Sequence, residues 1–169
     1  MRKSGVIYEE IFREFQRQKV RYLIVGGIAF NLLGGLRTTA DLDILVEMTD
    51  PNLLKIIKIL KKKGYRVKQP VNPLGLADET TRENWIKNKH LKAFNFYKEE
   101  GLQEVDLIID SPVRFERARK RAKYIKAGSL RLPVISINDL IQMKKAAGRD
   151  VDQWDVRELK KIRRWSKTR

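Results

Sequence analysis

The chain has 169 residues, of which 42% are hydrophobic, so it can bury a sizeable core and is not a disordered protein. It contains no cysteine and a single histidine, His90, which excludes disulfides and thiolate catalysis and argues against zinc sites of either ligand type. No apolar stretch is long enough to span a bilayer, and the charged N-terminus lacks the apolar core of a signal peptide. We therefore expect a soluble, cytoplasmic protein without a membrane partner.

The net charge is +16, from 37 basic and 21 acidic residues. A composition rich in lysine, arginine and glutamate is typical of thermophile surfaces, but surface ion-pair networks increase the numbers of acidic and basic residues together. Here the excess is clustered: residues 54–69, 114–131 and 157–169 contain seven, eight and seven bases with zero, one and one acid. Such clusters attract polyanions such as nucleic acid, and the solvated helix faces of a thermostable protein explain them equally well.

In the first half of the chain, hydrophobic spacing predicts alternating helices and strands. Apolar side chains at Ile7, Ile11 and Phe15 follow the helical period, and a short continuous apolar run is typical of a strand buried on both faces. Asp50 followed by Pro51 is typical of a helix start, with Asp50 as the cap. The predicted elements are a helix over 5–18, a strand over 22–25, a helix over 28–33, a strand over 41–47 and a helix from 51 to 64.

In the second half, prolines and glycines separate shorter elements. A loop over 69–77 precedes a weak helix over 78–88, and Gly128 and Gly148 mark a second hairpin and a break between helices. The predicted elements are strands over 91–97 and 102–109 joined by a turn over 98–101, a basic helix over 112–122 opened by Pro112, the hairpin around Gly128, and helices over 136–147 and 152–164. This order predicts an α/β domain with a mixed sheet over residues 1–136 and a C-terminal helical segment over 137–169 packed on it.

Two aspartates on one predicted strand are the first candidate site. Asp41 and Asp43 are two residues apart, so their side chains leave the same face about 7 Å apart at the backbone. Oxygen ligands at that separation can bracket two magnesium ions about 4 Å apart. Because like charges on one strand face repel unless a cation offsets them, a metal site is favoured over two solvated acids.

Asp106 is the third candidate, on another predicted strand. Its neighbours Val105 and Leu107 face the core, so Asp106 points off the opposite face and would meet the other two aspartates if the strands are adjacent. There it could bind a catalytic ion and act as a general base or orient the attacking hydroxyl. Taken alone, Asp106 is better interpreted as a solvated acid.

A pair of glycines, Gly26 and Gly27, follows the buried strand and precedes a helix. Glycine allows the backbone to approach a phosphate, although an ordinary tight turn explains the pair as well. The spacing excludes a P-loop and the G-x-G-x-x-G fingerprint. Arg37 and Thr39 could add a guanidinium and a hydroxyl to a bound triphosphate.

These residues together resemble the nucleotidyltransferase superfamily of DNA polymerase β. The matching positions are Gly26-Gly27, Gly34, Arg37, Thr39, Asp41-x-Asp43 and Asp106. The pattern is most similar to a minimal bacterial and archaeal branch that includes the AbiEii toxin group and the lincosamide nucleotidyltransferases. The tail also resembles that branch, through Asp139-Leu-Ile-x-Met-Lys144, Arg149, Asp152 and Asp155. The resemblance spans about residues 20–160.

The resemblance implies a nucleotidyltransferase fold and transfer of a nucleoside monophosphate from an NTP to an acceptor, with Mg²⁺ or Mn²⁺ as cofactor and release of pyrophosphate. By this resemblance, Asp41 and Asp43 would bind both metal ions and Asp106 would also bind the catalytic one. Gly26 and Gly27 would bind the triphosphate. Lys144 could reach a phosphate or be a surface lysine, and Arg149 would form an ion pair with Asp152 or Asp155. Many members have Gly-Ser where this chain has Gly26-Gly27, although the minimal branch commonly has Gly-Gly.

The acceptor stays open between RNA or tRNA, a protein and a small molecule, and the basic clusters favour RNA or an acidic protein. The AbiEii likeness suggests a toxin with an antitoxin partner. A non-catalytic basic nucleic-acid-binding protein on the same fold is the alternative, and a structural or partner-binding protein is a third. No motif that interleaves basic and aromatic residues is evident in the sequence, and Trp85, Trp154 and Trp165 are predicted to be core or interface anchors.

Overall fold

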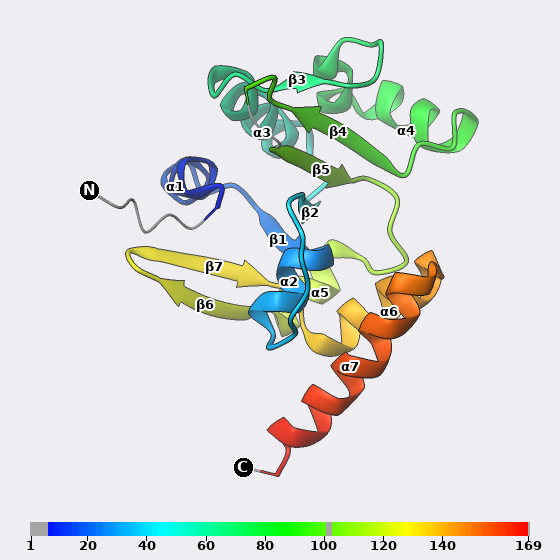
Figure 1. Ribbon diagram of the computed structural model, residues 1–169. Coiled ribbons are helices and arrows are strands. Elements are labelled where there is room, and N and C mark those ends of the chain that lie inside the picture. The colour runs from blue at the N-terminus through cyan, green and yellow to red at the C-terminus, as the bar shows by residue number, and fades with distance from the viewer. Residues whose placement is uncertain (1–6, 101–102, 169) are drawn as a thin grey trace.

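The computed structural model describes residues 7–100 and 103–168, so part of the predicted turn over 98–101 lies outside the described residues. Within them the chain forms one mixed sheet of seven strands with helices around it (Figure 1). The strands are β1 (Tyr22–Val25), β2 (Leu42–Val46), β3 (Arg66–Val67), β4 (Ala93–Tyr97), β5 (Glu104–Ile108), β6 (Lys123–Ala127) and β7 (Leu130–Val134). The helices are α1 (Glu9–Arg17), α2 (Gly26–Leu32), α3 (Asp50–Lys62), the 3₁₀ helix η1 (Pro73–Ala77), α4 (Glu79–Asn88), α5 (Phe115–Arg121), α6 (Ile137–Ala147) and α7 (Asp150–Ser166).

The strand order is β3-β4-β5-β2-β1-β7-β6. The α/β class, the mixed sheet and both hairpins are confirmed, because β4 pairs with β5 and β6 with β7 in antiparallel fashion. The short strand β3 was not predicted, since two residues show no alternation of apolar and polar side chains. The basic helix α5 begins at Phe115, so the prediction that Pro112 opens it was wrong.

The strand directions bring distant segments to one end of the sheet. Because β1 runs antiparallel to β2, and β2 runs parallel to β5, the carboxyl end of β1 meets the amino ends of β2 and β5. Strand β7 is parallel to β1, so α6, which follows β7, also starts at that end. The glycine turn, the two aspartate-bearing strands and the C-terminal helices therefore converge.

The central strands form the core. All four residues of β1 are buried, and Leu42, Ile44 and Val46 of β2 are fully buried, as their alternation predicts. Helix α3 starts one residue later than its cap Thr49, so the prediction of Asp50 as cap was wrong. Asp50 instead forms an ion pair with the buried Arg82, with 2.8 Å between the Oδ1 and Nη1 atoms. This pair joins the start of α3 to α4.

Helices α6 and α7 form a hairpin beside the sheet (Figure 1), and α6 contacts α2. Gly148 ends α6 with a φ of +67°, a left-handed conformation that glycine adopts without strain. The division into residues 1–136 and 137–169 stays a prediction.

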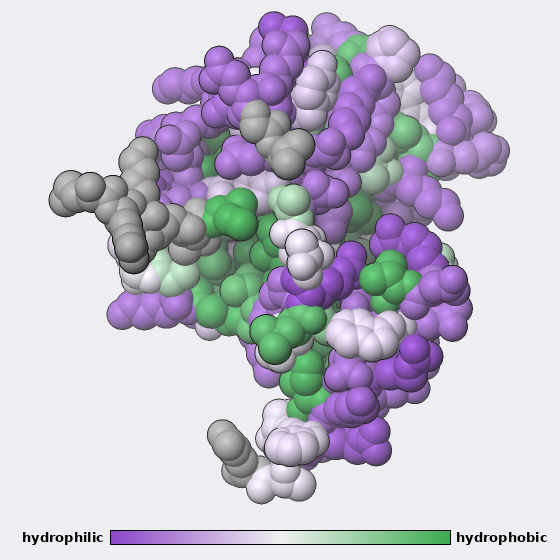
Figure 2. Space-filling model, in the orientation of Figure 1, coloured by the Kyte–Doolittle hydropathy of each residue, from purple (hydrophilic) through white to green (hydrophobic). Residues whose placement is uncertain are grey.

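Hydrophilic side chains cover α3, α4 and most of α6 and α7, and apolar ones emerge where α2 meets β1 and β7 (Figure 2). No helix in the described ranges has the length and apolar character needed to cross a membrane.

Candidate active site

The glycine turn contacts the strand that bears the aspartates. Helix α2 begins at Gly26 itself, which has a φ of +65°. A Cβ atom added to Gly26 would lie 1.9 Å from Oδ2 of Asp43, and one added to Gly27 would lie 2.6 Å from Oγ1 of Thr39. Both glycines are therefore required by space, because the Asp43 carboxylate and the Thr39 hydroxyl occupy the volume of a side chain.

Asp43 and Asp106 are direct neighbours in the sheet. They pair in register on the parallel strands β2 and β5, whose backbones are about 4.8 Å apart. Both are half-buried, between apolar neighbours that are fully buried, such as Ile44 and Val105. The adjacency of the two strands, on which the meeting of Asp106 with the other aspartates depends, is thus present for Asp43.

Asp41 lies one residue before β2 and is exposed. Among residues 7–100 and 103–168, no three acidic, histidine or cysteine side chains are grouped closely enough to hold a metal ion. The structure thus brings Asp43 and Asp106 together and leaves Asp41 at the margin. The metal-binding role of the three aspartates stays a prediction.

Electrostatics at this site disfavour ionised carboxyls. Burial, followed by the charges of Asp106 and Asp41, raises the pKa of Asp43 to about 7, although Lys144 and Arg149 act in the opposite direction. Burial is also the main cause that raises the pKa of Asp106. Mutually repelling carboxylate oxygens are the donor set that a hard divalent cation prefers, so the residues fit Mg²⁺ or Mn²⁺.

Two amide side chains that the sequence analysis did not identify hold Asp106 in place. The Nδ2 atom of Asn95 on β4 donates to Oδ1 of Asp106 at 2.7 Å. Gln69 holds Asn95 in turn: its Nε2 atom donates to Asn95 Oδ1 at 2.7 Å, and its Oε1 atom accepts from the Asn95 backbone N–H at 3.2 Å. One feature of the sequence could have identified Asn95: it is a polar residue between Phe94 and Phe96 in an apolar strand. In the predicted hairpin this position lies opposite Asp106.

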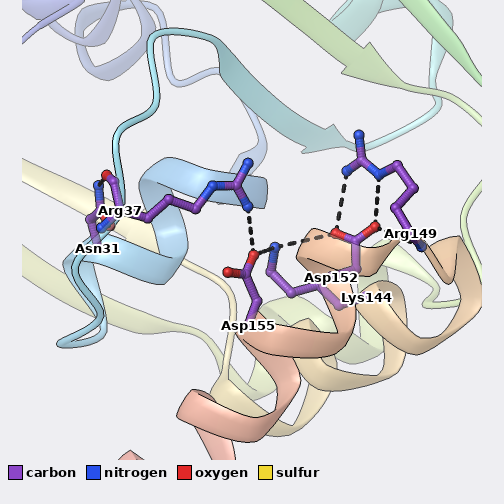
Figure 3. Close-up of polar contacts among 6 residues, drawn as sticks. All are labelled: Asn31, Arg37, Lys144, Arg149, Asp152 and Asp155. Atoms are coloured by element: carbon purple, nitrogen blue, oxygen red, sulfur yellow. Dashed lines mark hydrogen bonds and ion pairs between the residues drawn. The ribbon is translucent and has the colours of Figure 1, made fainter.

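An ion-pair network lies at the junction of α6, α7 and the loop before β2 (Figure 3). The carboxylate Oδ2 of Asp155 accepts from Nη1 of Arg37 at 2.6 Å and from Nζ of Lys144 at 2.5 Å. Lys144 also lies 3.6 Å from Oδ1 of Asp152, which is held by Nε of Arg149 at 2.7 Å through its Oδ2. Asp155 and Asp152 are almost completely buried.

The burial of Lys144 excludes one of its two interpretations and leaves its contact with a phosphate a prediction. Only 5% of Lys144 is exposed, so the surface-lysine alternative was wrong. The predicted ion pair between Arg149 and Asp152 is confirmed. Asn31 fixes the Arg37 backbone through hydrogen bonds of 2.8 and 3.0 Å, so the loop leading to Asp41 is tied to the last helix.

Comparison with solved structures identifies the fold. The lincosamide antibiotic adenylyltransferase LnuA, bound to lincomycin, is 18% identical with a TM-score of 0.60, over 90% of this chain and 93% of that one. ANT(2")-Ia in complex with adenylyl-2"-tobramycin is 12% identical with a TM-score of 0.55, over 94% of each chain. A nucleotidyltransferase-like protein from Paracoccidioides brasiliensis is 16% identical with a TM-score of 0.51, over 90% and 71%.

No curated protein matches the sequence. A family model described as "Nucleotidyltransferase of unknown function (DUF6036)" matches residues 7–166, nearly the whole chain. The nucleotidyltransferase fold, predicted from the glycine and aspartate pattern, is thereby confirmed. The chain belongs to this family of nucleotidyltransferases.

Proposed function

We propose that this nucleotidyltransferase moves a nucleoside monophosphate from an NTP to an acceptor hydroxyl or phosphate, releases pyrophosphate and depends on a divalent metal. The observation that carries the proposal is that Asp43, which lies directly against the backbone of Gly26, pairs in register with Asp106. Two half-buried carboxylates beside a glycine turn supply oxygen ligands for a metal next to a surface on which phosphates can lie.

In this proposal Asp41, Asp43 and Asp106 hold Mg²⁺ or Mn²⁺. When bound, the metal neutralises phosphate charge and makes the acceptor hydroxyl more acidic. Asp106 would accept the proton of that hydroxyl or orient the hydroxyl for attack, and the 2.7 Å hydrogen bond from Asn95 to one of its oxygens fixes the direction of the carboxylate.

The triphosphate would lie along Gly26 and Gly27, with the Thr39 hydroxyl beside them. Arg37 and Lys144 are the candidate cations, and both are engaged by Asp155. Arg37, with 25% of its side chain exposed, is better placed to contact a phosphate than the buried Lys144. Lys144 would then act through charge, as its influence on the pKa of Asp43 suggests.

The acceptor within this proposal is RNA, tRNA or an acidic protein, favoured over a small molecule by the basic clusters. The toxin role, its antitoxin partner and the cytoplasmic location stay predictions. A non-catalytic nucleic-acid-binding protein on the same fold is the second candidate, and the clustered positive charge supports it equally.

Label transfer tests the activity directly. The protein is incubated with each α-labelled NTP, Mg²⁺ or Mn²⁺, and either total RNA or protein lysate, and covalent label is then measured. The double variant Asp41→Asn/Asp43→Asn should lose transfer, whereas Asp110→Asn, which removes an exposed carboxylate just beyond β5, should retain it.

Calorimetric titration of the NTP adds a second measurement. Wild type should bind the NTP in a metal-dependent manner and the double variant should not. Equal, metal-independent binding by both, together with no label transfer to RNA or protein, would contradict the proposal and favour the non-catalytic candidate.

A further inference from the structure

A basic groove lies at the opposite end of β1 from the glycine turn. Residues after α1, the start of β1, helix α5 and the β6–β7 hairpin surround a hollow of about 430 Å³. A second hollow of about 320 Å³ along the hairpin shares Tyr124 and Arg131 with it, so we treat the two as one groove. The basic side chains that line it are Lys19, Arg21, Arg119, Lys126 and Arg131.

The positive charge of this groove is largely uncompensated. None of the residues that line it, all within the described part of the chain, is acidic. Arg21 forms ion pairs with Glu47 and Glu116, but no acid in the described ranges forms an ion pair with the other four cations. An anion would therefore be attracted here without first displacing a protein carboxylate.

An exposed aromatic ring lies among these cations. Tyr124 on β6 is 48% exposed, and the guanidinium carbon of Arg131 lies 4.3 Å from the centre of its ring. Lys126 pairs with Arg131 in the hairpin, and Tyr124 pairs with Pro133, so these four side chains share one face. That face has cations along it and one ring whose surface is partly open.

We propose that this groove binds a single-stranded nucleic acid, with the cations on successive phosphates and one base stacked on Tyr124. Basic grooves with an accessible aromatic ring are the common means of holding single strands, because every base has a face that can stack. A duplex keeps its bases stacked on each other, and the carboxylate side chains of an acidic peptide have no ring that could stack on Tyr124. Arg119, Lys126 and Arg131 of the basic cluster over residues 114–131, which the candidate active site does not use, would then contact phosphates.

The binding site does not rest on the proposed transfer reaction. Its residues include none of the aspartates or glycines of the candidate active site. Binding should therefore persist in Asp41→Asn/Asp43→Asn, and this result separates a failure of the groove from a failure of the transfer proposal.

Fluorescence anisotropy of labelled oligonucleotides tests the inference, with RNA and DNA single strands of about twelve nucleotides, the same RNA as a duplex, and a polyglutamate peptide. Tyr124→Ala should weaken single-strand binding about tenfold, and Tyr124→Phe, which keeps the ring, should restore it. Arg119→Gln/Arg131→Gln should also lower the slope of log K against log salt by about 1.4, for two lost phosphate contacts.

Lys58→Gln/Lys62→Gln on the exposed face of α3 is the matched control, because it removes the same charge away from the groove. It should leave the affinity within about twofold of wild type. The inference is overturned if the control weakens binding as much as the groove variant, if Tyr124→Ala binds as tightly as wild type, or if polyglutamate or the duplex binds as well as the single strand.

Discussion

The aspartate pair and the ion-pair network lie at the same end of the sheet, but buried negative charge is neutralised by protein cations only in the network. Around Asp43 and Asp106, like charges face each other, and within residues 7–100 and 103–168 the only side chain that contacts either carboxylate with a hydrogen bond is the neutral amide of Asn95. In the ion-pair network at the same end of the sheet, Asp155 and Asp152 are more deeply buried, but each carboxylate contacts two cations.

The second region stabilises the fold, whereas the first has the charge balance of the ligand site that we propose. A buried charge with protein partners holds elements together, and here it joins α6, α7 and the loop at Arg37. Buried carboxylates that have no cation beside them raise the free energy of the folded chain. Such an arrangement is typical of functional sites, where a bound ligand supplies the positive charge. This contrast can be tested from both sides.

Removing the shared counter-ion should have the largest effect. Asp155→Ala leaves Arg37 without its carboxylate and the buried Lys144 with Asp152 alone, at 3.6 Å, and we expect a loss of about 3–5 kcal/mol in the free energy of unfolding, measured with urea. If that variant does not fold, Asp155→Asn, which keeps the shape, gives the same sign with a smaller loss. Glu158→Gln, which breaks only an exposed pair with Lys161, is the control and should cost less than about 1 kcal/mol.

Removing a charge from the carboxylate pair should have the opposite sign. The pKa of Asp43 is about 7 in the folded chain against 3.8 ordinarily, so between these values the folded state binds more protons than the unfolded state. Asp43 therefore lowers stability as pH rises from about 4 to about 7, by about 4 kcal/mol when fully ionised. Asp43→Asn should match wild type near pH 4 and exceed it in stability near pH 8.

Urea unfolding across this pH range measures the difference in stability between wild type and Asp43→Asn. Repeating it with added Mg²⁺ gives a second comparison. The metal should stabilise wild type at pH 8 by binding the folded state, and it should have little effect on Asp43→Asn. A stability difference that does not vary with pH would show that Asp43 is not held under charge repulsion.

The amide that orients Asp106 should have a moderate effect on catalysis. Asn95→Ala removes the 2.7 Å hydrogen bond, and we expect kcat to fall about tenfold with little change in the KM for the NTP. Asn95→Asp should be worse, since it adds a fourth negative charge. Asn88→Ala, at the exposed end of α4, should be neutral; a change in KM alone for Asn95→Ala would argue against a positioning role.

The outermost pair of the network should matter least. Arg149 has 70% of its side chain exposed, and Lys144 remains near Asp152 without it. Arg149→Gln should therefore cost less than about 1 kcal/mol in urea unfolding. A loss comparable with that of Asp155→Ala would show that the network acts as one unit.

Much of the fold followed from local patterns. The continuous apolar run of β1 and the alternation in β2 and β5 predicted strands that the structure confirms, and Gly148 marked the break between α6 and α7. Which residues of each strand face the core predicted that Asp43 and Asp106 leave the opposite face, and the parallel pairing of β2 with β5 in the structure makes them neighbours. Periodicity is reliable here because burial enforces it.

What could not be predicted depends on segments far apart in the chain. Lys144 is buried because Asp155, on the next helix, accepts its charge, and no local pattern distinguishes such a lysine from an exposed one. Gln69 reaches Asn95 from a loop. The basic groove likewise joins Lys19 and Arg21 to the bases and Tyr124 of residues 119–131, which are far away in the sequence.

The parallel pairing of β2 with β5 has a consequence for how the protein can vary. No hairpin sets this alignment, since more than fifty residues separate the strands, and buried positions such as Leu42, Ile44, Val105 and Leu107 specify which face of each strand points to the core. A shift by one position would turn the carboxylates inward and the leucines outward. Replacing one buried aliphatic residue by another in these strands should thus lower the catalytic rate before it unfolds the protein. The packing of the core would in this way set the distance between the carboxylates at the edge of the sheet.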